Sequence, residues 1–377
     1  MFHRPRASSM FAALLWNILA TATTAGISRA AEPVVQPAVD GILAAFEKHP
    51  LVGLGELHML ANELTFYAIL VRDPRFASTV GNVVVEFGAS QHQDILDRYL
   101  NGERVAYSEI AKVWRNTVNH TPTLMGVGYQ TFFAQVRAVN QSLPPEKRIH
   151  VWLSEPPIDW SATKTHDGWQ QIYDQRYRHA AEMIEREILD RGKKALVIYG
   201  TGHFFSSPWP STWPVPSGGT ETMGEIVERK HPGSFFLVMP YGGYKDPDCS
   251  TALEAQMQWP KRVLISPIRD TPLQEALMRT ECMSKLEGLD PPIPADELAR
   301  LERHDYEIDT GVAGDALLYI APAAELKMTP DDPTIWMDLE YYEELSRRLQ
   351  LRFGEPMAPL SVTVRTYALP PQPWRRP

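Results

Sequence analysis

Seven short, mostly apolar segments, bounded by glycine, proline or polar residues, constrain the fold of this chain more than any other feature. They lie at Leu51–Glu56, Asn82–Phe87, Ile149–Glu155, Ala195–Tyr199, Phe235–Met239, Val263–Ile265 and Ala316–Ile320. The segments between them carry apolar residues at helical spacing, most clearly residues 170–191, which stop at Gly192. Apolar strands that alternate with amphipathic helices are typical of α/β proteins. We therefore expect a mostly parallel central sheet flanked by helices on both faces.

The first thirty residues have the pattern of a secretory signal peptide. Arg4 and Arg6 precede an apolar run, Met10–Ala20, and Ser28 and Ala30 supply small residues for cleavage. An uncleaved membrane anchor is the alternative, but a run this short does not span a bilayer comfortably. We expect residues 1–30 to be removed and the protein to be periplasmic or secreted.

The remaining chain is expected to form a single α/β domain, residues 31–368, followed by a flexible tail, residues 369–377. Within it, residues 204–220 are rich in proline, tryptophan and serine. That composition excludes a helix or a central strand, so we expect a loop there. After residue 30 no stretch approaches the length of a membrane span, so no integral membrane segment is expected in the mature chain.

The charge of the mature chain excludes one class of partner. Removing residues 1–30 lowers the number of lysines and arginines from 37 to 34, against 46 acidic residues, which gives a net charge of −12. Nucleic acids and anionic membrane surfaces select basic faces, so neither is an expected partner. A small-molecule or peptide ligand is the remaining expectation.

The chain contains two cysteines, Cys249 and Cys282. Exported proteins meet an oxidising environment in which disulfides form and persist. We expect the two cysteines to form a disulfide; two unpaired thiols are the alternative.

Acidic and histidine side chains follow four successive predicted strands. Glu56 and His58 follow the first, Glu86 ends the second, Glu155 ends the third, and His203 follows the fourth. Ligands of parallel sheets bind beyond the carboxyl ends of the strands. We therefore expect these five side chains to meet at one edge of the sheet and to form the site.

Glycines flank both histidine turns, at Gly53 and Gly55 and at Gly200 and Gly202. They permit backbone conformations and close approaches that a Cβ atom forbids, which favours a functional interpretation of the two turns. His120 follows a helix in a loop. It is either a further base or ligand of the site, or a loop histidine that faces solvent.

Two imidazoles and two or three carboxylates suit a divalent transition metal such as zinc, manganese or iron. On this hypothesis Glu56, His58, Glu86 and His203 are the ligands, and a glutamate acts as the base towards metal-bound water. Alternatively, a glutamate–histidine pair activates water without metal. A third interpretation is a hydrogen-bonded polar plug at the end of the sheet. Glu155 is expected to support the site in each case.

Three segments together resemble the Tiki/ChaN-like superfamily: VGLGELHMLANE at Val52–Glu63, NVVVEFG at Asn82–Gly88 and ALVIYGTGHF at Ala195–Phe204. The marks of that group are a Gly-Glu-x-His motif after the first strand, a glutamate after the second, and a later Gly-x-x-His. GDALLYIAP, at Gly314–Pro322, also resembles the closing strand of bacterial members. The group joins haem-binding uptake proteins of the ChaN type, TraB/PrgY proteins, Tiki metalloproteases and erythromycin esterase-like enzymes.

The resemblance implies a compact α/β fold with the site at one edge of the sheet. Tiki-type members are metal-dependent peptidases that use the glutamates and the Gly-x-x-His histidine, whereas erythromycin esterase-like members hydrolyse an ester with histidine and glutamate. ChaN-type members are linked to haem binding and iron uptake. Their resemblance implies an axial ligand such as His58, His203, Tyr199 or Tyr241.

These observations favour an exported hydrolase that acts on an ester or peptide bond through its glutamates and histidines. A haem- or iron-binding uptake protein without turnover is the second hypothesis. An inactive protein kept for its interactions is the third.

Overall fold

The computed structural model describes residues 32–119, 126–205, 221–283, 295–354 and 356–357. All of them belong to one compact unit, residues 31–377. The predicted signal peptide, His120, the tail at residues 369–377 and most of the predicted loop at residues 204–220 lie outside the described residues.

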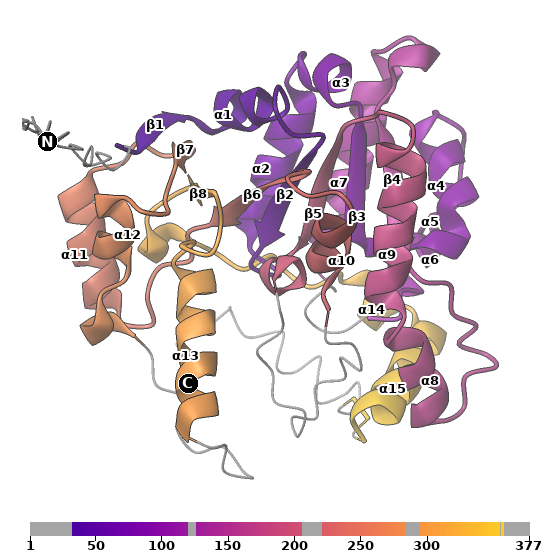
Figure 1. The fold of residues 1–377 in the computed structure, drawn as a ribbon. Helices are drawn as coiled ribbons and strands as arrows, with labels where there is room; N and C mark the ends of the chain where they lie inside the picture. Colours follow the sequence, from indigo (N-terminus) through magenta and orange to yellow (C-terminus); the bar gives the residue numbers. More distant parts are fainter. Residues whose placement is uncertain (1–31, 120–125, 206–220, 284–294, 355, 358–377) are drawn as a thin grey trace, which may run out of the picture. The chain divides into compact units, whose positions relative to one another are not determined.

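Eight strands form one sheet in the order β1-β7-β8-β6-β2-β5-β3-β4 (Figure 1). The strands are β1 Val34–Pro37, β2 Leu51–Glu56, β3 Asn82–Ala89, β4 His150–Glu155, β5 Ala195–Gly200, β6 Phe235–Pro240, β7 Val263–Ser266 and β8 Ala316–Tyr319. Strand β7 pairs antiparallel with β1 and β8, and every other pairing is parallel. The prediction of an α/β protein with a mostly parallel sheet is therefore confirmed. Edge strand β1 was not predicted, because it is short and largely exposed.

The α-helices are α1 Ala38–Ala45, α2 Ala61–Arg72, α3 Phe76–Thr79, α4 Gln93–Leu100, α5 Tyr107–Ile110, α6 Lys112–Arg115, α7 Val127–Gln141, α8 His166–Tyr173, α9 Arg176–Ile184, α10 Met223–Lys230, α11 Pro247–Met257, α12 Pro272–Leu277, α13 Ala295–Asp309, α14 Thr334–Met337 and α15 Leu339–Phe353. Short 3₁₀ turns lie at Ser90–His92, Pro145–Lys147, Thr201–Phe204, Thr280–Cys282 and Ala323–Glu325.

The prediction of one continuous helix over residues 170–191 is wrong. Helix α8 ends at Tyr173, α9 begins at Arg176, and a π-helical segment follows at Glu185–Leu189. The break separates two packing environments. Tyr173 packs in a cluster with Trp169, whereas α9 packs its apolar residues against the sheet. One straight helix cannot face both.

Alternate residues of the central strands belong to two different hydrophobic clusters. In β5, Leu196 and Ile198 pack with residues of α1, α2, α4 and α7. The intervening residues of the same strand pack with residues of α9 and α10. Successive side chains of a strand point to opposite faces of a sheet, so each cluster takes one set of alternate residues.

A third cluster packs around β7, β8, α11 and α12. Cys249 in α11 and Cys282 are joined there by a disulfide, and Cys282 is buried. Among the described helices, none is both long and apolar enough to cross a membrane.

Loss of the disulfide is expected to destabilise the protein. The two cysteines are 33 residues apart in sequence, and closing a loop of that length contributes about 3–4 kcal/mol by restricting the unfolded chain. The Cys249→Ser/Cys282→Ser variant should therefore unfold at a lower denaturant concentration than the wild type. Dithiothreitol should lower the stability of the wild type and leave that of the variant unchanged. Equal stability of the two proteins under oxidising conditions would contradict the expectation.

Candidate functional site

The four strands that carry the predicted site residues are adjacent, in the order β2-β5-β3-β4. They run parallel, and Glu56 at the end of β2 pairs in register with Gly200 at the end of β5. Glu86 lies just after Val85, where the pairing of β3 with β4 shifts register. Such irregularities re-aim side chains and are frequent next to sites. The carboxyl ends of these strands form an edge that we call the rim.

His58 is held by a carboxylate on the inner side of the rim. Its Nδ1 lies 2.9 Å from Oε1 of Glu56, an oxygen that also accepts a hydrogen bond from the Tyr129 hydroxyl. Its Nε2 lies 4.0 Å from Oε2 of Glu86, and 25% of the side chain is exposed. Burial lowers the pKa of His58, but the hydrogen bond to Glu56 and the charge of Glu86 outweigh it and raise the pKa to about 9.

His203 occupies the opposite side of Glu86. Its Nε2 lies 3.0 Å from Oε1 of Glu86, and its Nδ1 lies 2.8 Å from the Tyr177 hydroxyl. Burial is the main reason that the pKa of His203 is lowered, and the charge of Arg176 adds to it. A neutral imidazole has one N–H group, so Nε2 donates to Glu86 while Nδ1 accepts from Tyr177.

Glu86 is 1% exposed and accepts hydrogen bonds on both oxygens. The backbone N–H of Gly200 donates to Oε2 at 2.9 Å, and Nδ2 of Asn119 lies 3.5 Å from Oε1. Burial raises the pKa of Glu86, but in acid, where His203 is protonated, the charges of His203, His58 and Arg176 and the hydrogen bond from His203 lower it well below its usual range. Glu86 is therefore a permanent carboxylate.

A buried arginine that was not predicted completes the rim. Arg176 is 3% exposed; its Nη2 lies 3.9 Å from Glu86 and 3.0 Å from each ring nitrogen of His203. Its guanidinium stacks on the rings of Tyr173 and Tyr177 at 4.6 and 4.7 Å. Arg176 and Tyr177 lie within the helical pattern of residues 170–191, so no sequence signal distinguished them as site residues.

Glu155, predicted as a supporting residue, is 1% exposed, and its Oε2 has no hydrogen-bond partner among the described residues. Burial is the largest cause that raises its pKa to about 8, and the charge of Glu86 adds to it. Glu155 is therefore largely protonated at neutral pH.

A second buried acid that was not predicted lies behind the rim. Glu63 is fully buried and accepts from the backbone N–H of Leu57 at 3.0 Å and from the Tyr67 hydroxyl at 3.1 Å. Burial raises its pKa well above the usual range, and the charge of Glu56 adds to this. Its place within the Val52–Glu63 motif was the only sequence signal that pointed to it. Glu63 positions the turn that carries His58.

Three of the predicted metal ligands form a group with metal-binding potential. One ligand atom each from His58, Glu86 and His203 lies within 4.8 Å of the other two. Glu56 is not in this group, because it lies behind His58 on Nδ1. A carboxylate in that position orients a histidine ligand through its other nitrogen. The donor set of two imidazoles and one carboxylate therefore fits zinc or a similar metal, with Arg176 as a competing cation.

Comparison with known proteins leaves the family of the chain open. No family model matches the sequence, and no curated protein matches it. A solved structure of the type III effector HopBA1 is 16% identical, with 55% of this chain and 87% of that chain covered and a TM-score of 0.32. A Bacillus cereus protein is 12% identical, with 74% of this chain and 89% of that chain covered and a TM-score of 0.43. Neither likeness assigns an activity.

Substitution of Gly200 is expected to displace His58. A Cβ atom on Gly200 would lie 2.6 Å from Nε2 of His58, closer than atoms can pack, whereas a Cβ on Gly202 would meet nothing within 4 Å. Gly200→Ala should therefore weaken the contact of His58 with Glu56, and the pKa of His58 should fall from about 9 towards that of a free histidine. Histidine titration by NMR measures this shift. Gly202→Ala is the matched control, and a fall of equal size in both variants would contradict the packing argument.

Glu155 is expected to make the protein less stable as the pH rises. Folding raises its pKa from 4.5 to about 8, so the folded chain holds a proton that the unfolded chain has lost between these values. The contribution of Glu155 to the unfolding free energy should therefore fall by about 1.4 kcal/mol per pH unit across this window.

Glu155→Gln, which mimics the protonated acid, should remove that slope and be more stable than the wild type at about pH 8. Denaturant unfolding over the same pH range measures the slope. The control is Glu146→Gln at an exposed glutamate, which should keep the wild-type slope. Parallel curves for the wild type and Glu155→Gln would refute the assignment.

Proposed function

We propose that the protein is an exported hydrolase that cleaves an ester or peptide bond at the rim. The observation that carries the proposal is the convergence of His58, Glu86 and His203 within 4.8 Å. Glu56 behind His58 and Tyr177 behind His203 fix the orientation of both imidazoles. Such layered hydrogen bonding from buried groups is typical of sites that activate water.

Each side chain of the rim has a separate role in proton transfer. Glu56 accepts from Nδ1 of His58, which directs Nε2 of His58 towards Glu86. Below its pKa of about 9, His58 holds a proton that it can donate to a leaving group. Once deprotonated, the same nitrogen accepts a proton from water. Glu86 remains ionised throughout and stabilises positive charge on either imidazole.

A metal-dependent version uses the same residues. When bound, a divalent metal such as zinc, manganese or iron would lower the pKa of a water molecule. His58, Glu86 and His203 would hold it. For His203 to use Nε2 as a ligand, its proton must move to Nδ1, and the Tyr177 hydroxyl must then accept rather than donate.

The proposal includes export and a sheet covered on both faces. The signal-like pattern of residues 1–30 and the Cys249–Cys282 disulfide support export, because disulfides persist in oxidising compartments. The alternate residues of β5 in two separate clusters support helices on both faces. The ligand class, a small molecule or peptide, follows from the bond proposed to be cleaved.

Hydrolysis should depend on the carboxylates of the rim. Glu86→Gln and Glu56→Gln should each lower kcat/KM for a panel of aryl esters and peptides by at least about 100-fold, because both orient proton-transferring imidazoles. His49→Gln, which changes a histidine near the start of β2, is the matched control and should keep wild-type activity. Full activity in Glu86→Gln would refute the proposal.

Elemental analysis of the freshly purified protein distinguishes metal-dependent hydrolysis from metal-free hydrolysis. Stoichiometric metal that is lost in His203→Gln supports the metal-dependent version. Metal-free turnover that rises with pH up to about 9, the pKa of His58, supports the version in which His58 itself accepts the proton.

A competing proposal is haem or iron carriage without turnover. It uses the partly exposed His58, whose Nδ1 is anchored by Glu56, as an axial ligand through Nε2. It predicts a Soret band on addition of haemin to the mature protein, which His58→Gln abolishes. If the protein shows neither turnover nor haem binding, an inactive interaction protein is the remaining proposal.

A further inference from the structure

A cleft of about 750 Å³ lies against helix α15. Its walls come from the segments after β3 and β4 and from helix α15, and they include Gln91, Asn116, Trp160, Lys164, Arg347 and Arg348. We call it the α15 cleft. In Figure 1, α15 lies next to α8, which the contacts between these helices support. Its volume falls in the range of small-molecule sites.

The walls of the α15 cleft carry three cations, Lys164, Arg347 and Arg348, and two acids, Asp159 and Glu344, so cations are in excess by one charge. Both oxygens of Glu344 accept from the guanidinium groups of Arg347 and Arg348. Asp159, the other acid of the wall, accepts from the N–H and hydroxyl of Ser161. Lys164 is exposed and forms no hydrogen bond or close ion pair with a described residue, although its charge helps to lower the pKa of Asp159.

The walls also hold hydrogen-bond donors that the described residues do not use. A guanidinium has five N–H hydrogens. Arg347 makes four hydrogen bonds with described residues and Arg348 makes three, which leaves three N–H hydrogens between them. Trp160 is 5% exposed, and its indole N–H has no partner among the described residues. A wall with spare donors and positive charge selects a ligand rich in acceptors.

Aromatic stacking adds to the ion pairs with Glu344 in holding the arginines of α15. The guanidinium of Arg348 lies 4.6 Å from the centre of the Trp160 ring, and that of Arg352, one turn later, lies 4.8 Å from the Trp169 ring. An aromatic face attracts a cation but carries no net charge. Because Arg347 and Arg348 share the single carboxylate of Glu344, the three side chains together keep one positive charge.

A short segment connects the α15 cleft to the rim. Asn116 lines the cleft, and three residues later Asn119 donates to Glu86 and accepts from Arg352. Three residues of extended chain span at most roughly 11 Å. Asn119, which contacts Glu86, therefore lies within roughly 11 Å along the backbone of Asn116 in the wall of the cleft.

We propose that the α15 cleft binds an oxyanion of the substrate, a carboxylate or a phosphate, and so selects acidic esters or peptides for cleavage at the rim. Lys164 and the indole N–H of Trp160 contact the anion, and Arg347 and Arg348 supply further donors. The choice of substrate rests on the proposed hydrolase function. The anion site itself does not, because it is a property of the cleft.

Direct binding tests the anion site without reference to turnover. Inorganic phosphate and succinate are titrated into the mature protein by calorimetry. At least one of them should bind with 1:1 stoichiometry. Lys164→Glu should weaken the binding by about tenfold or more, and Trp160→Phe, which keeps the ring and removes the N–H, by a smaller factor.

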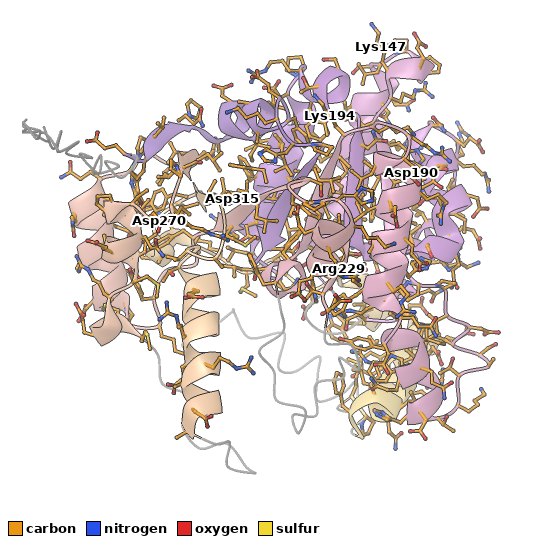
Figure 2. All side chains as sticks on the ribbon, viewed as in Figure 1. Lys147, Asp190, Lys194, Arg229, Asp270 and Asp315 are labelled. Carbon is orange, nitrogen blue, oxygen red and sulfur yellow. A yellow bond between two sulfur atoms is a disulfide. The ribbon has the colours of Figure 1, made fainter. Side chains whose placement is uncertain are left out.

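Lys147→Glu is the matched control, because Lys147 is also exposed but lies near the start of β4, away from α15 (Figure 2). It should bind like the wild type. Absence of saturable binding by both anions, or binding that Lys164→Glu and Trp160→Phe leave unchanged, overturns the proposal. Binding of one anion but not the other identifies which oxyanion the cleft takes.

Turnover of matched esters tests the selectivity. The 4-nitrophenyl hemisuccinate should have a higher kcat/KM than the neutral butyrate, and Lys164→Glu should lower this preference by about tenfold. If neither ester nor any peptide is cleaved but the anions bind as expected, the hydrolase proposal fails and the anion site stands. If esters are cleaved with no acidic preference and no anion binds, the anion site fails and the hydrolase proposal stands.

Discussion

The buried carboxylate of Glu86 is the interaction on which the rest of the rim depends. It receives the N–H of Gly200 at the end of β5, contacts His203 on one oxygen, and faces His58 with the other. An ionised carboxylate is costly to bury unless charges and hydrogen bonds compensate it. Each group that compensates Glu86 is therefore also held in place by it. This mutual dependence ties together side chains that lie far apart in the sequence.

The ionisable groups next to Glu86 differ in their protonation. Arg176 lies 3.9 Å from Glu86 and is itself buried, whereas Glu155 on the neighbouring strand is largely protonated at neutral pH. Burial is the main reason that Glu155 keeps its proton, and the charge of Glu86 adds to it. Glu86 therefore places a permanent negative charge between His58 and Arg176.

The sequence predicted the elements that follow from simple periodicities. Continuous apolar runs located seven of the eight strands, and the position of Glu56, Glu86 and His203 after them indicated one common edge. The predictions that failed concern features that tertiary packing determines. The break between α8 and α9 arises because Tyr173 and the residues of α9 pack in different clusters, and helical spacing alone does not reveal that.

The partners of the site residues were harder to predict for the same reason. Arg176 and Tyr177 reach His203 from a helix more than twenty residues earlier in the chain, and Tyr129 reaches Glu56 from another helix. Strand ends converge by the geometry of a parallel sheet, so their meeting is predictable. A helix, by contrast, meets the rim at a rotation and height set by its packing against the sheet, which no local pattern encodes.

The α15 cleft has an excess of cations, whereas at the rim the carboxylate of Glu86 lies between His58 and Arg176. Glu86 would repel an acidic group placed against it, whereas Lys164 and the stacked arginines of α15 attract one. An acidic substrate would therefore bind in one direction, with its anion in the cleft and its neutral scissile bond towards His58. Because Asn119 contacts both Glu86 and Arg352, the two regions are parts of one hydrogen-bonded frame. The anion is thus held at a fixed distance from the imidazoles, and orientation of this kind lowers the entropic cost of reaching the transition state.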